Sequence, residues 1–569
     1  MDYKKLYDLW SSRKLEDSAL TDELEAIRGN DREIEDRFYQ ELEFGTAGLR
    51  GVLGAGTNRM NIYTVRRATQ GLCDYLKARA KSPSIAIAYD SRLYSEQFAR
   101  DSAAVCAANG VKAYLYGELM PTPALSYAVR ELHCHAGINI TASHNPSKYN
   151  GSKAYGPDGA QLAGEAADAV MQNILKTDLF DGVAMADYQA ALADGRIEII
   201  GEALIQQFLN RVLAEQVNPG VCKNAGLRLV YTPLNGAGRR CVLTVLEKMG
   251  IADVTIVPEQ EWPDGNFPTC PYPNPEIVEA LALGLKLVEQ KQADLLLATD
   301  PDCDRVGAAV LENGKPRLIS GNEMGVLLID YIARSKKAAG TLPKNPVVVK
   351  SLVSTTMADA VAASHGVEIR AVLTGFKYIG EQIALLEAAG EADRFLLGFE
   401  ESYGYLSGGY VRDKDAVDGS MLICEMAAWY KTQGKHLGQA LDDLYATYGR
   451  YLNKVDSYTF EGSDGMARMS GLLECLRQTP PAAIAGFGID YTTDYRSGQR
   501  TQNGQTSPTG LPAANVLEYG LGGVGSVIVR PSGTEPKLKV YYSLKGDSLE
   551  AVTATQAAIK ADVEKLLGL

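Results

Sequence analysis

The residues best suited to chemistry in this sequence form the segment Thr141-Ala142-Ser143-His144-Asn145-Pro146. The segment follows a short apolar run at 136–140, which predicts a buried strand with polar residues at its carboxyl end. Ligands of α/β sheets bind at this end of the strands. A serine alone is a weak nucleophile and needs a base, a metal or a charged group beside it. Ser143 is therefore the candidate nucleophile.

A second polar loop, Asp300-Pro301-Asp302-Cys303-Asp304-Arg305, follows another apolar run at 294–299. Its alternating carboxylates favour Mg²⁺, which prefers hard oxygen ligands, over a solvated acidic turn. A calcium EF-hand needs glycine at loop position six and glutamate at position twelve, where this chain has Arg305 and Leu311. We expect Asp300, Asp302 and Asp304 to bind Mg²⁺. Arg305 beside them either neutralises a phosphate or forms a structural ion pair.

A third loop, Arg530-Pro531-Ser532-Gly533-Thr534-Glu535-Pro536-Lys537, contains the groups that bind a phosphate dianion. A guanidinium, hydroxyls, backbone N–H groups around a glycine and a lysine are all phosphate ligands. The segment Ser-Gly-Thr alone would indicate an ordinary turn. The flanking Arg530 and Lys537 favour a phosphate site.

Two further segments carry weaker signals. The segment Phe399-Glu400-Glu401-Ser402-Tyr403-Gly404-Tyr405 offers carboxylates and a hydroxyl for sugar hydroxyls, with an exposed acidic turn as the alternative. The glycine-rich segment 44–51 ends near Arg50 and is no dinucleotide fingerprint, because it lacks G-x-G-x-x-G between a strand and a helix. It either brings Arg50 close to Ser143 or forms a flexible loop.

A pattern of strand, helix, strand, helix, strand recurs three times and positions three of these loops. The first round has strands at 84–89, 112–116 and 136–140 with helices near 94–109 and 123–132; the second has strands at 227–232, 254–257 and 294–299 with helices at 237–249 and 275–291; the third has strands at 346–350, 367–373 and 394–398 with helices at 355–365 and 376–389. Each round ends in an apolar strand that runs into a polar loop, and the rounds share no residue-by-residue repeat.

The remaining segments indicate covers and a separate C-terminal part. Helices are expected in residues 1–43 and in the alanine-rich stretch from 160 to 212. Residues 485–515 are rich in glycine, threonine and aspartate, which is typical of hairpins and loops. Strands at 525–530 and 538–543 then flank the third polar loop, and a helix at 548–567 closes the chain.

Composition and charge exclude several classes of protein. The 569 residues are 46% hydrophobic and 22% charged, as in ordinary globular proteins, and length alone suggests about four domains. The formal net charge of −13 excludes a global basic field for nucleic acid or anionic membrane. The charged start of the sequence and the lack of a run near 18 apolar residues predict neither a signal peptide nor a membrane-spanning segment. The nine cysteines include no C-x-x-C pair and are typical of reduced thiols, which predicts a cytoplasmic protein.

Taken together, the four loops resemble those of the α-D-phosphohexomutase family, and within it the long bacterial phosphoglucomutase and phosphomannomutase type. The similarity covers most of the chain and includes, in order, the TASHNP serine loop, the D-x-D-x-D-R metal loop, the G-F-E-E-S sugar loop and the R-P-S-G-T-E phosphate loop. The resemblance implies an α/β fold with three similar mixed α/β domains and a smaller C-terminal α+β domain around one central cleft. The expected domains are 1–212 with the phosphoserine and an N-terminal helical cover, 213–322 with the metal, 323–452 with the sugar site and 453–569 with the phosphate site.

The resemblance also implies roles for individual residues. Ser143 would be phosphorylated in the active enzyme, and its phosphate oxygen would join the three aspartates as a fourth Mg²⁺ ligand. The implied groups near the transferred phosphoryl are Arg50, His144 and Lys153; those for the sugar and the mouth of the cleft are Arg305, Thr374, Gly375, Lys377, Glu400, Ser402 and Lys414; those for phosphate are Arg530, Ser532, Gly533, Thr534 and Lys537. Cys303 replaces the glycine common in the metal loop, and Tyr405 replaces a histidine of short bacterial members, so that histidine's proton-transfer role does not carry over.

The function implied is an isomerase that moves a phosphoryl group within glucose phosphates, from the 1- to the 6-position, through a glucose 1,6-bisphosphate intermediate that also serves as activator. Phosphomannomutase and phosphopentomutase activities of the same family are alternatives. A metal-dependent sugar phosphatase would share the serine and the carboxylates but would pass the phosphoryl group to water. A non-catalytic sugar-phosphate sensor would need no nucleophile. The expected partners are small hexose phosphates, not nucleic acid or membrane; the general base (His144 or Lys153), the role of Cys303 and the oligomeric state stay open.

Overall fold

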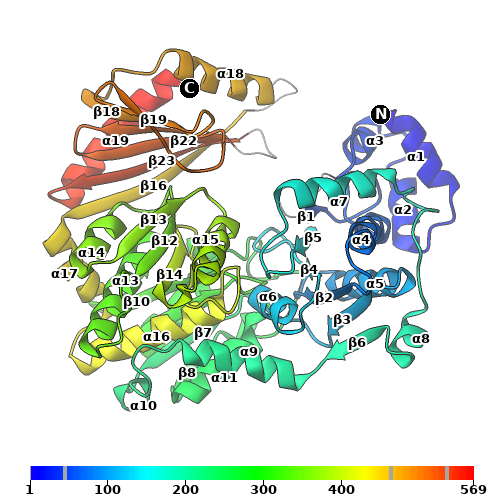
Figure 1. Ribbon diagram of the computed structural model, residues 1–569, viewed down its shortest axis with the longest axis horizontal. Helices are drawn as coiled ribbons and strands as arrows, with labels where there is room; N and C mark the ends of the chain where they lie inside the picture. Colours follow the sequence, from blue (N-terminus) through cyan, green and yellow to red (C-terminus); the bar gives the residue numbers. More distant parts are fainter. Residues whose placement is uncertain (1, 43–47, 461–464, 532–536, 569) are drawn as a thin grey trace. The chain divides into compact units, whose positions relative to one another are not determined.

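The computed structural model describes residues 2–42, 48–460, 465–531 and 537–568, and its chain divides into two compact units. Unit 1 comprises residues 1–319, 383–385 and 403–432, and unit 2 comprises residues 320–382, 386–402 and 433–569. Figure 1 shows the course of the chain through both units. Each unit is described by itself.

Unit 1 begins with a helical cover and a six-stranded sheet of order β1-β5-β4-β2-β3-β6. The cover consists of α1 (Tyr3–Ser12), α2 (Ser18–Ala26) and α3 (Asp31–Phe38). The sheet is formed by β1 (Gly48–Val52), β2 (Ser84–Tyr89), β3 (Lys112–Tyr116), β4 (Ala136–Ile140), β5 (Tyr149–Tyr155) and β6 (Ile197–Ile200), with helices α4 (Ile62–Lys77), α5 (Ser95–Ala108), α6 (Thr122–Glu131), α7 (Gly164–Lys176), α8 (Tyr188–Ala193) and α9 (Glu202–Ala214). Trp10 is fully buried against the rings of Phe38, Tyr63 and Phe180, which fastens the cover to this domain.

The second sheet of unit 1 has the order β11-β10-β9-β7-β8. Its elements are α10 (Cys222–Ala225), β7 (Arg228–Thr232), α11 (Gly238–Met249), β8 (Asp253–Ile256), α12 (Val278–Lys291), β9 (Leu295–Thr299), β10 (Val306–Glu312) and β11 (Lys315–Ile319). All five residues of β9 are buried, as expected for a central strand covered on both faces. Later in the chain, β15 (Gly404–Leu406) and α16 (Ala416–Thr432) also belong to unit 1, and α16 packs on α9, α10 and α11.

Unit 2 contains a third sheet in which β12 pairs in parallel with both β13 and β14. Its elements are α13 (Gly321–Ala338), β12 (Val347–Ser351), α14 (Met357–His365), β13 (Glu368–Val372), α15 (Phe376–Ala388, whose residues 383–385 count with unit 1), β14 (Phe395–Glu400) and α17 (Leu437–Tyr448). Ser320 caps α13 through a reciprocal capping box with Glu323.

The C-terminal part of unit 2 is a mainly antiparallel sheet of order β16-β23-β22-β21-β18-β19-β20 that packs against α19. Its strands are β16 (Arg450–Thr459), β17 (Ala483–Ile484), β18 (Phe487–Asp494), β19 (Gln499–Gln502), β20 (Gln505–Pro508), β21 (Leu517–Leu521), β22 (Gly525–Pro531) and β23 (Lys537–Gly546), and its helices are α18 (Gly465–Gln478) and α19 (Leu549–Leu566). A hydrophobic cluster joins this part to the third sheet, with Val353 and Tyr378 on one side and Ile528 and Tyr541 on the other.

The three predicted rounds have one common topology. In each, the first strand lies between the second and the third, so the orders are β3-β2-β4, β8-β7-β9 and β13-β12-β14. In unit 1 the third strand of each round continues through a hairpin into an antiparallel strand, β5 or β10. The predicted α/β fold with three similar units and a smaller C-terminal α+β part is confirmed. Its central cleft stays a prediction.

One expectation was incomplete. The stretch from 160 to 212 is mostly helical as predicted, but it also contains β6, which pairs in parallel with the edge of β3. Four residues are too few for a periodic signal to distinguish a strand from a helical turn. Among the described residues, no helix has both the length and the apolar character needed to cross a bilayer.

Candidate active site

The serine loop connects β4 to β5 at the carboxyl edge of the first sheet. The chain leaves β2 toward β3 on one side and reaches β4 on the other, so this loop lies where the strand order reverses, the position that α/β sheets use for ligands. Ser143 is 4% exposed and has a left-handed backbone, with φ of +52°. Its hydroxyl donates to Asp300 Oδ2 over 3.0 Å and lies 3.1 Å from Nδ1 of His144. The structure therefore joins the predicted nucleophile to the predicted metal loop.

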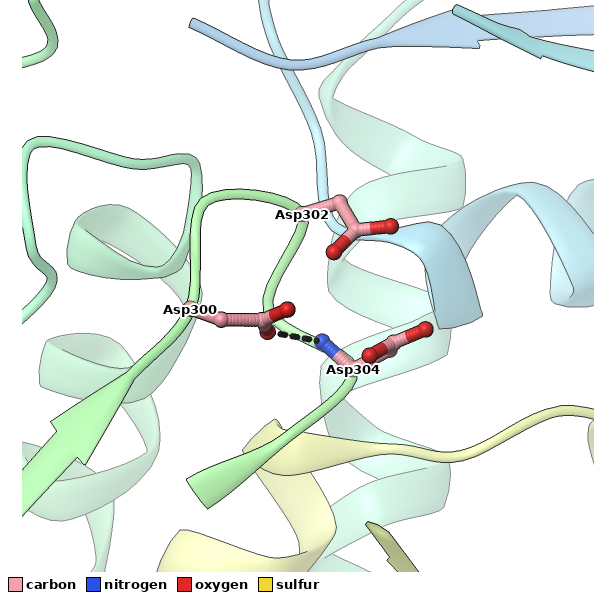
Figure 2. Close-up of side chains that lie close together, drawn as sticks. All are labelled: Asp300, Asp302 and Asp304. Carbon is pink, nitrogen blue, oxygen red and sulfur yellow. Dashed lines mark hydrogen bonds between the residues drawn. The ribbon is translucent and has the colours of Figure 1, made fainter. Parts of the chain in front are cut away.

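The metal loop connects β9 to β10 and gathers its three carboxylates. Figure 2 shows Asp300, Asp302 and Asp304 on one turn of chain, with the backbone N–H of Asp304 donating to Asp300 over 3.1 Å. One oxygen of each carboxylate lies within 4.8 Å of the others, and all three side chains are buried. Among the described residues, this is the group of three that could hold a metal ion.

The charge and bonding of the triad fit a divalent cation. Burial and the neighbouring carboxylates raise the pKa of Asp300 and of Asp304, because each added negative charge is poorly solvated. Oδ1 of Asp302 and Oδ1 of Asp304 are buried and accept no hydrogen bond. Buried polar atoms normally have partners, so these two oxygens fit the role of metal ligands. A hard cation such as Mg²⁺ would satisfy both oxygens and relieve the repulsion.

Three cationic side chains approach the same loop. Lys153, on β5, lies 2.9 Å from Asp302 Oδ2 and 3.9 Å from Asp304 Oδ2, and although burial opposes it, this ion pair lowers the pKa of Asp302. Nζ of Lys414 lies 3.0 Å from Asp304 Oδ2. Arg305 forms an ion pair with Glu276. Of the two roles that the sequence left open for Arg305, the structural ion pair is therefore present.

Arg50 and His144 contact the serine loop from outside the metal loop: Arg50 through Asn145, and His144 through Ser143. Arg50, on β1 opposite Gly151 of β5, is exposed and donates to the Asn145 side chain over 3.4 Å. Burial, together with the positive charges of Arg305 and Arg50, lowers the pKa of His144, so its imidazole is neutral near pH 7. All of the predicted phosphoryl-transfer residues thus gather around Ser143 and the metal loop.

Of the residues predicted for the sugar, Arg305 and Lys414 lie in unit 1 and the other five lie in unit 2. Glu400 ends β14, is 5% exposed, and accepts a hydrogen bond from the backbone N–H of Gly375 over 2.8 Å. The buried hydroxyl of Thr374 has no hydrogen-bond partner. Lys377 is the second residue of α15, its Nζ lies 4.9 Å from the ring of Tyr378, and burial lowers its pKa. Ser402 follows two residues after β14.

The predicted phosphate loop is partly described. Arg530 lies near the end of β22 and Lys537 begins β23, so both flank the segment that connects these two antiparallel strands. Burial raises the pKa of Tyr378, and the positive charge of Arg530 partly opposes this rise. The guanidinium of Arg530 therefore lies near Tyr378, at the start of α15. Ser532, Gly533 and Thr534 lie outside the described residues.

Sequence reasoning missed several side chains that hold this site together. Thr122, the first residue of α6, donates its hydroxyl to Asp302 Oδ2 over 2.9 Å and accepts from Asn139 over 2.7 Å. Asp413 accepts from Lys414 Nζ over 3.1 Å and from the hydroxyl of Tyr155 over 2.9 Å. No motif marks these residues, because they meet only when separate elements fold together. Arg92 differs, since its polar loop follows the predicted strand 84–89 directly.

Thr122→Val is expected to weaken Mn²⁺ binding to the triad by about 10-fold, the lower end of the range for residues that orient metal ligands. Valine has nearly the same shape as threonine but cannot donate to Asp302, while the backbone N–H of residue 122 still bonds the Asp302 carbonyl over 2.8 Å. Titration of Mn²⁺ followed by electron paramagnetic resonance measures the affinity.

Thr122→Ser is the matched control, because serine keeps the hydroxyl and loses only a methyl group. Its Mn²⁺ affinity should stay near that of the wild type. Equal affinities in the valine and serine variants would show that Thr122 does not orient Asp302.

The chain matches the phosphoglucomutase/phosphomannomutase family model in all four of its domains. The α/β/α domain I model matches residues 41–180, domain II matches 206–314, domain III matches 320–448 and the C-terminal domain matches 502–561. The four matches occur in order along one chain. They confirm the resemblance that the sequence loops predicted.

Named relatives and solved structures agree with this assignment. A phosphoglucomutase of Staphylococcus haemolyticus is 38% identical over 91% of this chain and 93% of its own length, and one of Staphylococcus epidermidis is 36% identical over 90% and 92%. In fold, the chain is similar to the phosphoglucomutase parafusin of Paramecium (TM-score 0.69, 18% identity, 93% of this chain and 97% of that one) and to a phosphoglucomutase/phosphomannomutase family protein of Burkholderia thailandensis (TM-score 0.68, 17%, 92% and 97%). With its serine and aspartate loops joined in one site and all four domain models matched, this chain belongs to the phosphoglucomutase/phosphomannomutase family.

Proposed function

We propose that this protein is an α-phosphoglucomutase, which interconverts glucose 1-phosphate and glucose 6-phosphate. The observation that carries the proposal is the hydrogen bond from the Ser143 hydroxyl to Asp300 of the aspartate triad, in a chain 38% identical to a named phosphoglucomutase. A nucleophile beside a metal site is the arrangement that phosphoryl transfer requires.

In this mechanism, phosphorylated Ser143 donates its phosphoryl group to the free hydroxyl of a glucose monophosphate. A general base accepts the proton of that hydroxyl. The Oγ–P bond breaks as the new O–P bond forms, which yields glucose 1,6-bisphosphate and free serine. The bisphosphate reorients, and its other phosphoryl group returns to Ser143. Glucose 1,6-bisphosphate therefore also activates enzyme molecules that have lost their phosphate.

Positioning and charge neutralisation supply most of the catalysis in such transfers. Asp300, Asp302 and Asp304 would hold Mg²⁺, which supplies positive charge at the transferring phosphoryl group. Lys153 and Lys414, already ion-paired with the triad, and the exposed Arg50 beside Asn145 add further positive charge. Of the two candidate bases, His144 accepts the proton of the attacking hydroxyl, because its imidazole is neutral, whereas Lys153 serves as an ion-paired cation.

We assign the other predicted residues to substrate binding. Glu400, Ser402 and the Thr374–Lys377 segment hold the sugar hydroxyls, with Lys377 and Tyr378 in contact at its end. Arg530, Lys537 and the 532–534 segment hold the phosphate that is not transferred. The four proposed domains, 1–212, 213–322, 323–452 and 453–569, thus carry the nucleophile, the metal, the sugar site and the phosphate site. We place the enzyme in the cytoplasm, where its nine free cysteines stay reduced.

Nuclear magnetic resonance of the product made from glucose 1-phosphate tests the function. Glucose 6-phosphate should form, and added glucose 1,6-bisphosphate should accelerate its formation. A phosphatase would instead release glucose and inorganic phosphate and would not respond to the bisphosphate. Release of inorganic phosphate as the main product would overturn the proposal.

Glucose 1-phosphate is expected to be preferred to mannose 1-phosphate and to ribose 1-phosphate. Glu400 and Ser402 would hold the 3- and 4-hydroxyls, which glucose and mannose share, so discrimination depends on contacts near C2. A site discriminates only modestly against an epimer when water replaces the lost contact, so mannose 1-phosphate should also react. Measuring kcat/KM for the three 1-phosphates under one set of conditions decides the ranking. A ranking led by mannose or ribose would contradict the assignment.

A further inference from the structure

The loop after β2 contains a fully buried arginine with an unusual set of partners. Arg92 exposes none of its side chain, and its guanidinium donates to four backbone carbonyls of one loop: those of Ser143, Asn145, Pro146 and Tyr149. The bonds to Pro146 and Tyr149 measure 2.9 and 3.0 Å. These four carbonyls span the whole connection from Ser143 to the start of β5.

Two further groups fix the guanidinium itself. Nε of Arg92 lies 3.5 Å from Oδ2 of Asp90, which is also fully buried. Asp90 in turn accepts from the Thr141 hydroxyl over 2.6 Å and from the backbone N–H of Arg92 over 2.9 Å. The ring of Phe267 lies 5.1 Å from the guanidinium carbon. The cation is therefore held between a carboxylate, an aromatic ring and the loop.

The topology explains why Arg92 meets this loop. Strands β2 and β4 pair in parallel, with Tyr89 opposite Ile140, so the loops that follow them are neighbours at the same sheet edge. The second round uses the same device, because the backbone N–H of Ala237, after β7, donates to the carbonyl of Pro301 in the metal loop. In the third round Ser351, at the end of β12, donates to Glu401 over 2.7 Å.

In the first round a positively charged side chain makes this contact. Ser143 has a left-handed backbone, a conformation that costs energy for a residue with a Cβ and persists only where its surroundings hold it. A planar guanidinium has five N–H donors in a fixed fork and can bind all four carbonyls, whereas a lysine ammonium has three donors on a flexible stem.

We propose that Arg92 is a positioning residue for phosphoryl transfer, which holds the 143–149 loop so that the Ser143 oxygen stays aimed at the metal loop. This inference rests on the proposed function of Ser143. The hydrogen bonds that Arg92 donates to the loop go to backbone carbonyls, and Arg92 takes no part in proton or phosphoryl transfer. Its contribution is to orientation, and a misplacement of about 1 Å can cost about 10²-fold in rate.

The test compares Arg92→Lys with Arg67→Lys. Arg67, on α4, is also a buried arginine that donates to backbone carbonyls, those of Ile174 and Thr177 at 2.9 and 2.8 Å, but it does not contact the serine loop. Both variants keep the charge and lose the planar fork, so both should lower the melting temperature.

Three measurements are made on the wild type and both variants. Arg92→Lys should lower kcat by about 10- to 100-fold with little change in KM, since orientation and not binding is lost. Hydrogen exchange of a peptide covering 141–149 should accelerate in Arg92→Lys alone. Intact mass should show one phosphate on the wild type. A wild type with neither this phosphate nor mutase activity would overturn the proposed function.

The positioning role is overturned separately. Wild-type kcat and wild-type exchange in folded Arg92→Lys would refute it, and so would an equal loss of kcat in Arg67→Lys. If Arg92→Lys does not fold, Asp90→Asn keeps the arginine and removes its carboxylate. That variant should show a smaller loss of kcat with faster exchange in 141–149, and unchanged exchange there would refute the role.

Discussion

Ser143→Ala is expected to abolish mutase turnover, with kcat lowered by about 10⁴-fold or more, as for other enzymes that lose their nucleophile. The fold should survive, because Ser143 contributes one hydroxyl at the end of β4 and no apolar packing. Alanine retains the backbone N–H that bonds the Thr141 hydroxyl over 2.7 Å. Steady-state kinetics measures the loss, and circular dichroism checks the fold.

Ser102→Ala is the matched control for this variant. Ser102 is another fully buried serine of unit 1, on α5, where its hydroxyl bonds that of Thr69 over 3.1 Å. Intact mass should show one phosphate on the wild type and on Ser102→Ala, and none on Ser143→Ala. Full activity of the Ser143 variant would end the phosphoserine mechanism.

Asp302→Asn is expected to lower kcat/KM by at least about 10²-fold and to raise the Mg²⁺ concentration needed for half-maximal activity. The amide removes one of three clustered negative charges and leaves the Lys153 ammonium, 2.9 Å away, without its nearest carboxylate. Activity measured over a series of Mg²⁺ concentrations separates the two effects. Chelation by EDTA should inactivate the wild type, and added Mg²⁺ should restore it.

Asp330→Asn controls for the loss of a buried carboxylate as such. Asp330, on α13 in unit 2, is 1% exposed and pairs with Arg334 at 2.9 Å, so its substitution should lower stability without changing the Mg²⁺ requirement. If Asp302→Asn and the chelated wild type both kept full activity, the aspartate triad would be structural only.

The sequence alone was sufficient to predict the repeated elements. Strands β4, β9 and β14 are buried along their whole lengths, and such strands appear as short, continuous apolar runs that end at polar residues. Their loops were recognisable because chemistry demands particular residue types at close spacing, as in the three alternating aspartates of the metal loop. Local physics therefore determined the fold class and the identity of the reactive groups.

The contacts that join these groups were decided by tertiary structure. The Ser143 hydroxyl meets Asp300 across 157 positions of sequence, and Thr122 meets Asp302 across 180. No local pattern encodes such a pair, because it depends on how two sheets pack within unit 1. The sequence likewise left Arg305 open between a phosphate ligand and a structural pair, and its partner Glu276 lies 29 positions away.

Arg92 shows most clearly what the sequence determines and what the tertiary structure adds. Its position after a buried strand was visible in the sequence, and so was its charge. Its role was not, because the sequence does not show that β2 and β4 are neighbours while β3 lies on the far side of β2. Sequence determines which polar groups stand at the ends of strands, since burial restricts the strands themselves to apolar residues. Strand order determines which of those groups meet, since only neighbouring strands bring their loops within hydrogen-bonding distance.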